Sequence, residues 1–204
     1  RVICQSQKGE IMSSKESILN SIRHNNKVQE VALPNIENFG ITFENKMEQF
    51  SKVIQTVGGK ALQCHKNELN QVIEELYPEA VFISSNVEEY TLATVKENEL
   101  KTPHELENLD LAIVKAEFAV AENGAVWMKN PSNKHRALYF IANNIVIIVS
   151  KDDIVNNMHE AYERIEFEKA GYGVFISGPS KTADIEQSLV IGAHGPKSGY
   201  VIFV

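Results

Sequence analysis

The chain of 204 residues is 43% hydrophobic and 23% charged, a composition typical of a globular protein that buries one core. Its net charge of −7 disfavours a general binder of nucleic-acid backbones, because that function needs a positive surface. Cys4 and Cys64 are too few and too far apart for a disulfide framework or a self-contained iron–sulfur site, which needs about four thiolates.

Apolar runs in the sequence are short. The longest, residues 145–149, is far below the roughly 20 residues that cross a bilayer. The first residues lack the long apolar region of a secretory signal. We therefore expect a cytoplasmic protein without membrane insertion.

The N-terminal region divides at Met12. Residues 1–11 show no helical or strand period, and we expect a non-native or disordered extension there, before a single domain over residues 12–204. Ser13 and Glu16 have the spacing of a capping box, in which a hydroxyl and a carboxylate each satisfy a free backbone donor. This spacing predicts a helix over residues 14–24.

The strongest helical pattern lies between residues 43 and 57. Apolar residues recur there at intervals of four, three, four and three, which is typical of an amphipathic helix, and Gly58-Gly59 ends it. The stripe could also form a coiled-coil surface. It covers only about two heptads, so we favour a helix that packs on its own sheet.

Strands and helices alternate in the next segment. Residues 60–64 read as a strand, residues 67–77 as a helix and residues 80–84 as a buried strand. Ser85 and Glu88 then repeat the capping-box spacing. This alternation predicts a mainly parallel sheet that helices cover on both faces.

The middle of the chain continues the same pattern. Residues 109–114 and 144–150 read as strands, and residues 152–169 as a helix. Asn123-Gly124 is a tight-turn signal, because both residues tolerate positive φ. Residues 137–142 are apolar and fit either a strand or a short helix.

A polar segment follows a further apolar strand, residues 173–176. The strand breaks at a Gly-Pro turn, and hydroxyl groups, a lysine and two acids follow before a predicted helix over residues 184–189. Open α/β sheets place ligands at the end of such strands. The last predicted strand covers residues 200–204.

The common nucleotide and nucleophile motifs are absent from the sequence. It has no Gly-x-x-x-x-Gly-Lys-Ser/Thr loop, no Gly-x-Gly-x-x-Gly fingerprint and no Gly-x-Ser-x-Gly elbow. The six histidines are scattered, without the His-x-x-x-His spacing of a metal site. We expect no metal site.

Two blocks near the C-terminus resemble the LUD-domain family, the lactate-utilisation proteins of the C type. They are Ser-Gly-Pro-Ser-Lys-Thr-Ala-Asp-Ile-Glu at residues 177–186 and Gly-Ala-His-Gly-Pro at residues 192–196. Residues 119–126 resemble the family's Ala-Glu-Thr-Gly-Thr segment, with Asn123 and Ala125 in place of its two hydroxyl residues. The resemblance covers about residues 12–204.

The resemblance implies a three-layer α/β/α fold with a mainly parallel central sheet, Rossmann-like and similar to the NagB/RpiA/CoA-transferase superfamily. Family members take part in bacterial oxidation of L-lactate to pyruvate, alongside partners that carry iron–sulfur clusters. The scarcity of cysteines fits a subunit that holds no such cluster itself. The cofactor is unknown from the sequence.

The candidate site combines groups that suit an anion with groups that transfer protons. Hydroxyls, a lysine and helix N-terminal amides would bind a carboxylate or a phosphate, and a histidine or a carboxylate would act as acid or base. The candidate ligand-binding residues are Ser177, Gly178, Pro179, Ser180, Lys181, Thr182, Asp184, Glu186, Asn123, Gly124 and Gly195; the candidate catalytic residues are Glu122 and His194. Turn, cap and first-turn roles remain open for several of them.

Three functions remain open from the sequence. The leading hypothesis is a component of an L-lactate oxidation system with its own pocket for a small anion or a phosphorylated cofactor. A stand-alone isomerase or CoA-transferase-like enzyme is the second. The third is a non-enzymatic assembly subunit for iron–sulfur proteins.

Overall fold

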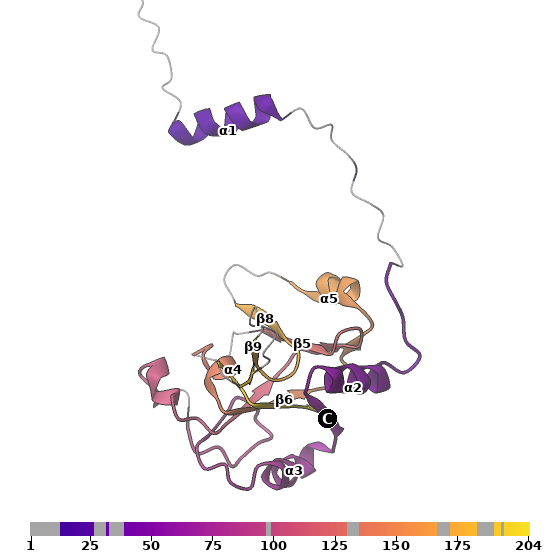
Figure 1. Ribbon diagram of the computed structural model, residues 1–204, viewed down its shortest axis with the longest axis vertical. Coiled ribbons are helices and arrows are strands. Elements are labelled where there is room, and N and C mark those ends of the chain that lie inside the picture. The colour runs from indigo at the N-terminus through magenta and orange to yellow at the C-terminus, as the bar shows by residue number, and fades with distance from the viewer. Residues whose placement is uncertain are drawn as a thin grey trace, which may run out of the picture. The chain divides into compact units, whose positions relative to one another are not determined.

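A five-stranded parallel sheet forms the centre of the larger part of the chain in the computed structural model (Figure 1). Its strands, in order across the sheet, are β1 (Lys60–Gln63), β11 (Ser198–Phe203), β6 (Asn144–Val149), β3 (Leu111–Lys115) and β2 (Ile83–Ser85). Strand β11, which follows the other four along the chain, therefore lies between β1 and β6.

The structure describes residues 13–26, 32, 39–96, 99–129, 135–166, 172–182, 190–192 and 194–204. The chain divides into two units, residues 1–38 and residues 39–204. In the first unit, helix α1 (Ser14–Asn25) begins at the capping box of Ser13 and Glu16, as predicted, and buries none of its side chains. The sheet belongs to the second unit.

Both faces of the parallel sheet are buried. Successive side chains of a strand point to opposite faces, and in β3 the side chains on each face join a different apolar cluster. Leu111 and Ile113 of β3 belong to the same apolar cluster as helix α3 (Leu69–Leu76). Ala112, between them, belongs to the cluster of helix α2 (Lys46–Thr56) on the other face. The predicted α/β fold with a mainly parallel central sheet is confirmed.

Helix α2 follows the predicted apolar stripe, although it begins three residues later, after the cap residue Asn45. Phe50 and Ile54 are fully buried, and the ring of Phe50 meets that of Phe203 edge-on with 5.2 Å between centroids. Removing a buried Phe side chain typically costs about 3–5 kcal/mol of stability. The stripe thus packs on the chain's own sheet.

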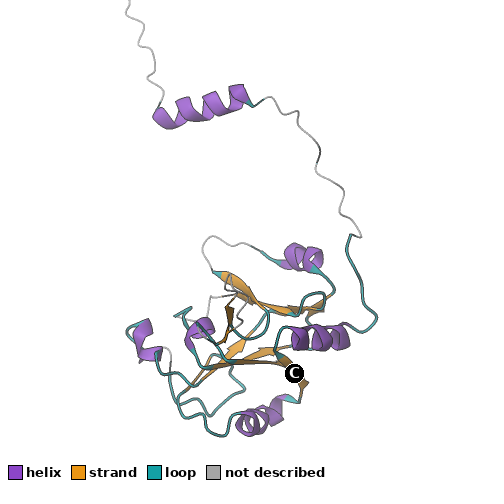
Figure 2. Cartoon of the chain, in the orientation of Figure 1, coloured by secondary structure: helices purple, strands orange, loops and turns teal. Residues whose placement is uncertain are grey.

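A second sheet of four strands lies beside the parallel sheet (Figure 2). Its strands, in order, are β7 (Ile154–Val155), β4 (Phe118–Val120), β5 (Ala125–Lys129) and β8 (Gly173–Ile176). Strands β4 and β5 form an antiparallel hairpin around the predicted Asn123-Gly124 turn. Helix α5 (Met158–Arg164) packs on this sheet through the fully buried Ala161.

The remaining described elements are short. They are η1 (Lys66–Glu68), η3 (Pro103–Leu106), α4 (Leu138–Ile141), β9 (Lys181–Thr182) and β10 (Val190–Ile191). Helix α4 resolves the ambiguous apolar segment 137–142 in favour of a helix. Strands β9 and β10 pair antiparallel, apart from both larger sheets.

The predicted helix over residues 152–169 is wrong at its start. Ile154 and Val155 form β7, because β-branched side chains suit a strand and the backbone of β4 offers a partner. The helix begins only after Asn157, whose side-chain oxygen accepts a hydrogen bond from the backbone N–H of Glu160 at 3.0 Å. The pairing of residues 154–155 with β4 therefore prevails over their apolar period, which alone would fit a helix.

The capping-box spacing of Ser85 and Glu88 does not begin a helix. The hydroxyl of Ser85 accepts a hydrogen bond from the N–H of Val87 at 3.0 Å, which closes a two-residue turn instead. Such local bonds compete with helix formation at serine. Strand β2 also begins later than predicted, at Ile83.

The predicted strand 173–176 is present as β8, but it belongs to the second sheet, antiparallel to β5. The polar turn that follows therefore does not lie at the carboxyl end of a strand of the parallel sheet. The expected extension over residues 1–11 and helix over residues 184–189 lie outside the described residues. None of the described helices has the length and apolar character that a membrane span requires.

A chain of polar groups ties α3 to two central strands. The hydroxyl of Ser198 donates to Asn144 Oδ1 at 2.8 Å, so the hydroxyl of Tyr77 is the donor in its 2.6 Å contact with Ser198. The ring of Tyr77 also meets Tyr200 edge-on. Burial raises the pKa of Tyr77 to about 12, since the phenolate would lose its hydration there.

This pKa gives a pH dependence with a definite sign. A folded-state pKa above the unfolded value of about 10 stabilises the fold fully below pH 10, and this stabilisation is lost as the pH rises towards 12. We expect urea unfolding of the wild type to lose about 1–2 kcal/mol more than Tyr77→Phe over this range, after allowance for partial exposure. Tyr162→Phe, at an exposed tyrosine, is the control and should follow the wild type; coincident wild-type and Tyr77→Phe profiles would contradict the assignment.

Candidate functional site

The predicted polar turn forms one wall of a pocket of about 300 Å³. The pocket is lined by Tyr139, Phe140, Ile145, Phe175, Ile176, Ser177, Gly178, Pro179, Ser180, Lys181, His194, Gly195 and Pro196. These residues come from α4, the start of β6, the end of β8, the turn that leads into β9, and the segment before β11. Residues 177–181 and 194–195, both singled out from the sequence, therefore share one site.

Backbone hydrogen bonds bring the two segments together. The N–H of Ser180 donates to the carbonyl of Pro196 at 2.9 Å, and the N–H of Gly192 donates to the carbonyl of Ser180 at 3.0 Å. A Cβ at Gly195 would lie 3.0 Å from Cβ of Ser180 and 3.2 Å from the carbonyl of Phe140. The pocket wall is thus held by main chain and close packing.

The residues that follow α2 pack against the polar turn. Gly178 has φ +72°, and a Cβ there would lie 2.9 Å from the carbonyl oxygen of Val57. A Cβ at Gly59 would lie 3.2 Å from Cα of Gly178. Only glycine allows this backbone conformation together with this approach, so packing requires glycine at position 178.

The Asn123-Gly124 turn touches the same region from the second sheet. Gly124 has φ +67°, and a Cβ there would lie 3.1 Å from the backbone nitrogen of Ile54 in α2. The hydroxyl of Ser177 donates to the carbonyl of Asn123 at 3.0 Å. The side chain of Asn123 accepts from the N–H of Ala125 at 3.1 Å and so stabilises its own turn.

Glu122 has a structural partner outside the pocket. Its carboxylate accepts a hydrogen bond from the backbone N–H of Met158 at 2.9 Å, at the first residue of α5. A carboxylate in this position accepts a hydrogen bond from a free backbone N–H of the helix and interacts favourably with the positive end of the helix dipole. Glu122 is not among the residues that line the pocket with His194.

The remaining candidates lie at the edge of what the structure describes. Thr182 belongs to β9, where its backbone pairs with Val190. Asp184 and Glu186 lie outside the described residues. In the described ranges, no group of three or more His, Cys, Asp and Glu side chains is placed to hold a metal ion.

The chemistry of the pocket is divided between two walls. Ser177, Ser180 and Lys181, with the exposed His194, provide hydroxyls, an ammonium group and an imidazole. Phe140 and Ile145 belong to an apolar wall. A small molecule with an anionic end and an apolar end is complementary to such a pocket, since Lys binds carboxylates and phosphates as a point charge.

Sequence reasoning missed the apolar wall. Tyr139 and Phe140 belong to α4, only four residues long, which gives no helical period to recognise. Ile145 was recognised as part of a buried strand, but periodicity does not show which end of a strand borders a cavity.

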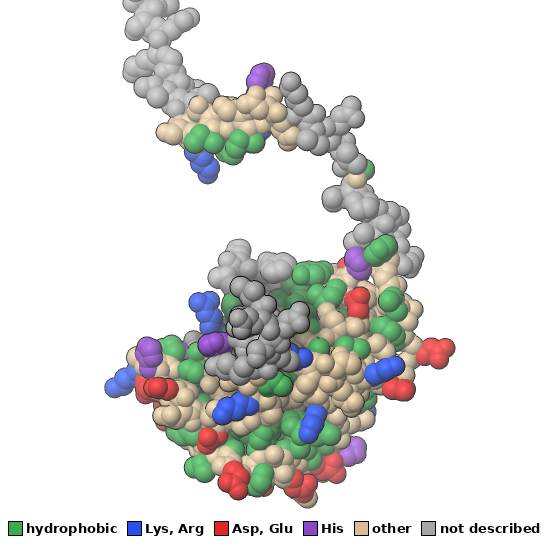
Figure 3. All heavy atoms as spheres, in the orientation of Figure 1, with side chains coloured by type: hydrophobic (Ala, Val, Ile, Leu, Met, Phe, Trp, Pro, Cys, Tyr) green, Lys and Arg blue, Asp and Glu red, His purple; other side chains and the backbone are tan. Residues whose placement is uncertain are grey.

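In the view of Figure 3, acidic and basic side chains intermingle over the described surface, without one broad field of either charge.

The contact between Gly124 and α2 predicts a stability effect. Gly124→Ala should lower the free energy of unfolding by about 1–3 kcal/mol, because alanine resists positive φ and its Cβ would crowd the backbone of Ile54. Gly199→Ala is the matched control, since Cβ contacts there begin at an ordinary 3.4 Å. Urea unfolding measures both; equal losses in the two variants would contradict the argument.

The bond from Glu122 to α5 predicts a structural role. Glu122→Ala should lower the free energy of unfolding by about 1 kcal/mol, whereas Glu122→Gln, which keeps an acceptor, should lose less. Glu88→Ala, at an exposed acid, serves as control in the same thermal unfolding experiment. A Glu122→Ala protein as stable as wild type would show that the bond contributes nothing.

Comparison with known proteins places these features in a family. The LUD domain family model matches residues 47–204. A lactate utilization protein C from Geobacillus kaustophilus is 35% identical over 103 residues, 47% of this chain and 43% of the relative. Lactate utilization protein C 1 from Bacillus mycoides is 37% identical over 100 residues, 46% of this chain and 43% of the relative. The matched segments thus span less than half the length of these relatives.

A solved structure shares the fold. The crystal structure of a DUF162 family protein from Deinococcus radiodurans matches with a TM-score of 0.62 at 20% identity, over 81% of this chain and 99% of that one. At this identity the likeness concerns the fold alone. The family model, in contrast, matches well over half of the residues and includes both segments of the pocket, so the chain belongs to the LUD domain family.

Proposed function

We propose that this chain takes part in lactate utilisation, and that its pocket binds a small anion that takes part in that process. The names of the two related lactate utilization proteins support the first part. The single observation that carries the second is the joining of residues 177–181 and 194–195 in one pocket.

A short carboxylic acid suits the two walls of the pocket. The ammonium group of Lys181, with the hydroxyl of Ser180, would bind the carboxylate, and the side chains of Phe140 and Ile145 would contact the apolar end. L-Lactate and pyruvate both have this form. A phosphate group could occupy the same polar wall, so the two classes need separate tests.

We further propose that electron transfer belongs to partner proteins. Oxidation of lactate to pyruvate releases two electrons and two protons, and these need an acceptor. The two cysteines of this chain are too few for an iron–sulfur cluster of its own. In this proposal His194 provides a proton-transfer group beside the bound anion, and iron–sulfur partners accept the electrons.

Binding measurements test the pocket. Pyruvate, L-lactate and inorganic phosphate would be titrated into the purified chain by calorimetry. We expect Lys181→Gln to weaken binding of the preferred anion about tenfold, since it removes the cation of the polar wall. Lys101→Gln, at an exposed lysine outside the pocket, should bind as wild type does. Unchanged affinity in Lys181→Gln would refute the assignment of the site.

Growth measurements test whether the chain takes part in lactate utilisation and whether Lys181 is needed for it. Deleting the gene should impair growth on L-lactate, and wild-type protein should restore it better than Lys181→Gln. Unimpaired growth with unchanged lactate oxidation would remove lactate utilisation as the function. Turnover of a phosphorylated sugar or an acyl-CoA by the purified chain alone would favour the stand-alone enzyme instead.

A further inference from the structure

The parallel sheet has a second hollowed edge, opposite the pocket already described. That pocket lies near the amino end of the sheet, beside Ile145 at the start of β6 and Pro196 just before β11. Open parallel sheets bind ligands at the carboxyl ends of their strands, where neighbouring strands connect to opposite faces. The carboxyl edge of this sheet has such a point.

The chain leaves β1 and β6 towards opposite faces of the sheet. After β1 it enters η1 and α3, whose residue Leu69 packs in one apolar cluster. After β6 it enters β7, whose residue Ile154 packs in the other. Strand β11 lies between β1 and β6, so a crevice opens around Val204, where the two exits diverge.

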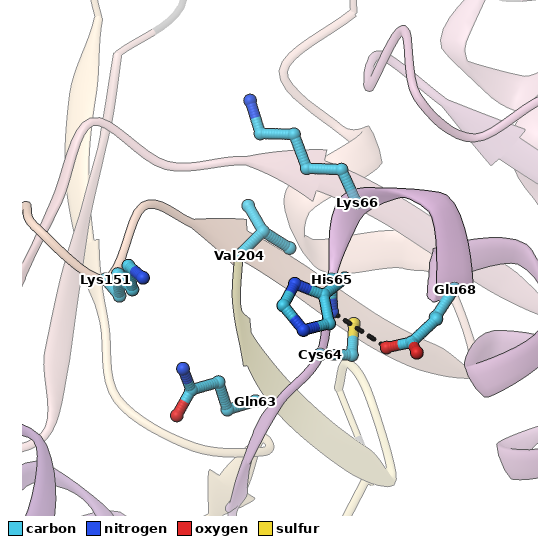
Figure 4. Close-up of a pocket in the computed structure, with 7 residues that line it drawn as sticks. All are labelled: Gln63, Cys64, His65, Lys66, Glu68, Lys151 and Val204. Carbon is cyan, nitrogen blue, oxygen red and sulfur yellow. Dashed lines mark hydrogen bonds between the residues drawn. The ribbon is translucent and has the colours of Figure 1, made fainter.

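Two adjoining cavities occupy this edge. The first, of about 320 Å³, is lined by Gln63, Cys64, His65, Lys66, Glu68, Lys151 and Val204 (Figure 4). The second, of about 290 Å³, is lined by Lys66, Val87, Glu89, Lys115, Ala116, Glu117, Ile148, Val149, Ser150, Asp153 and Val204. Lys66 and Val204 line both, so the two cavities are neighbours, and together they are called the crevice below.

Most acidic groups of the crevice already have partners. Figure 4 shows the carboxylate of Glu68 turned to the backbone N–H of His65, which donates to it at 3.0 Å. Asp153 pairs with Arg164. Glu89 accepts a backbone hydrogen bond that lowers its pKa, and it pairs with Lys66 at 3.4 Å.

The lysines of the crevice are more available. Lys66 is 64% exposed in its pair with Glu89, and a pair so exposed contributes only about 0–1 kcal/mol. Among the described residues, no acidic group lies within ion-pairing distance of Lys151 or Lys115, although the charge of Lys115 contributes to the lowered pKa of Glu89. Three ammonium groups and four carboxylates therefore line the crevice. Among the described residues Glu117 has no ion-pair partner, and a ligand that binds Lys66 must displace Glu89 from it.

We propose that this crevice binds a ligand with a diphosphate group, held by Lys66, Lys115 and Lys151 across the two cavities. A diphosphate has several anionic oxygens, so it can contact more than one of the three ammonium groups and can replace Glu89 at the exposed Lys66. This site is separate from the anion pocket of Lys181 and does not depend on its function.

Protection of Cys64 from alkylation tests the proposal, because this thiol lines the first cavity. In a Cys4→Ser background, iodoacetamide would be applied at constant ionic strength and alkaline pH, since burial and Glu68 raise the pKa of Cys64. Peptide mass spectrometry then gives the alkylation rate. We expect pyrophosphate to slow it saturably, and more than inorganic phosphate does.

Charge variants locate the binding. Lys151→Gln and Lys115→Gln should each raise the half-protecting concentration of pyrophosphate about fivefold, and Lys101→Gln and Lys181→Gln should leave it unchanged. Tighter binding of ADP than of pyrophosphate would identify a nucleotide, and equal binding the diphosphate alone. Absence of protection, or protection lost only in Lys181→Gln, would overturn the proposal. Failure of pyruvate and lactate to bind would count against the pocket of Lys181 and would not affect the proposal for the crevice.

Discussion

The end of α2 and the residues that follow it lie in direct contact with the backbone of two turns that are distant from them in sequence. Gly59 meets Gly178, and the backbone of Ile54 meets Gly124. A side chain at either turn would separate these segments. Because the turn at Gly124 connects two strands of the second sheet and the turn at Gly178 follows a third, this junction fixes the second sheet against the helix, and with it one wall of the pocket that contains Lys181.

Elements with a strong internal signal could be predicted from the sequence. The β-branched run at residues 145–149 identified β6, and the apolar stripe identified α2, since each is stabilised by burial that its own pattern reveals. The assignment of Ile154 and Val155 to a strand could not be predicted, because it depends on hydrogen bonds to β4. For the same reason, residues 173–176 were recognised as a strand without an indication of the sheet that contains them.

In the candidate site too, some residues could be predicted from the sequence and others depend on how distant segments meet. Local composition indicated the hydroxyls and the lysine at residues 177–181, and the structure brings them beside His194. The position of Glu122 depends on where the first turn of α5 lies, which its own neighbours in sequence do not determine. The carboxyl-edge crevice was missed altogether, because Lys66, Lys115 and Lys151 are far apart along the chain and meet only through strand order.

The strand order also bears on how the protein is made. Strand β11 separates β1 from β6, so the sheet remains in two parts on the ribosome until the residues of β11 have been synthesised. Until then the apolar edges of β1 and β6 have no partner, and long-range parallel pairing is intrinsically slow. These unpaired edges favour aggregation of a nascent chain in which β11 has not yet been synthesised.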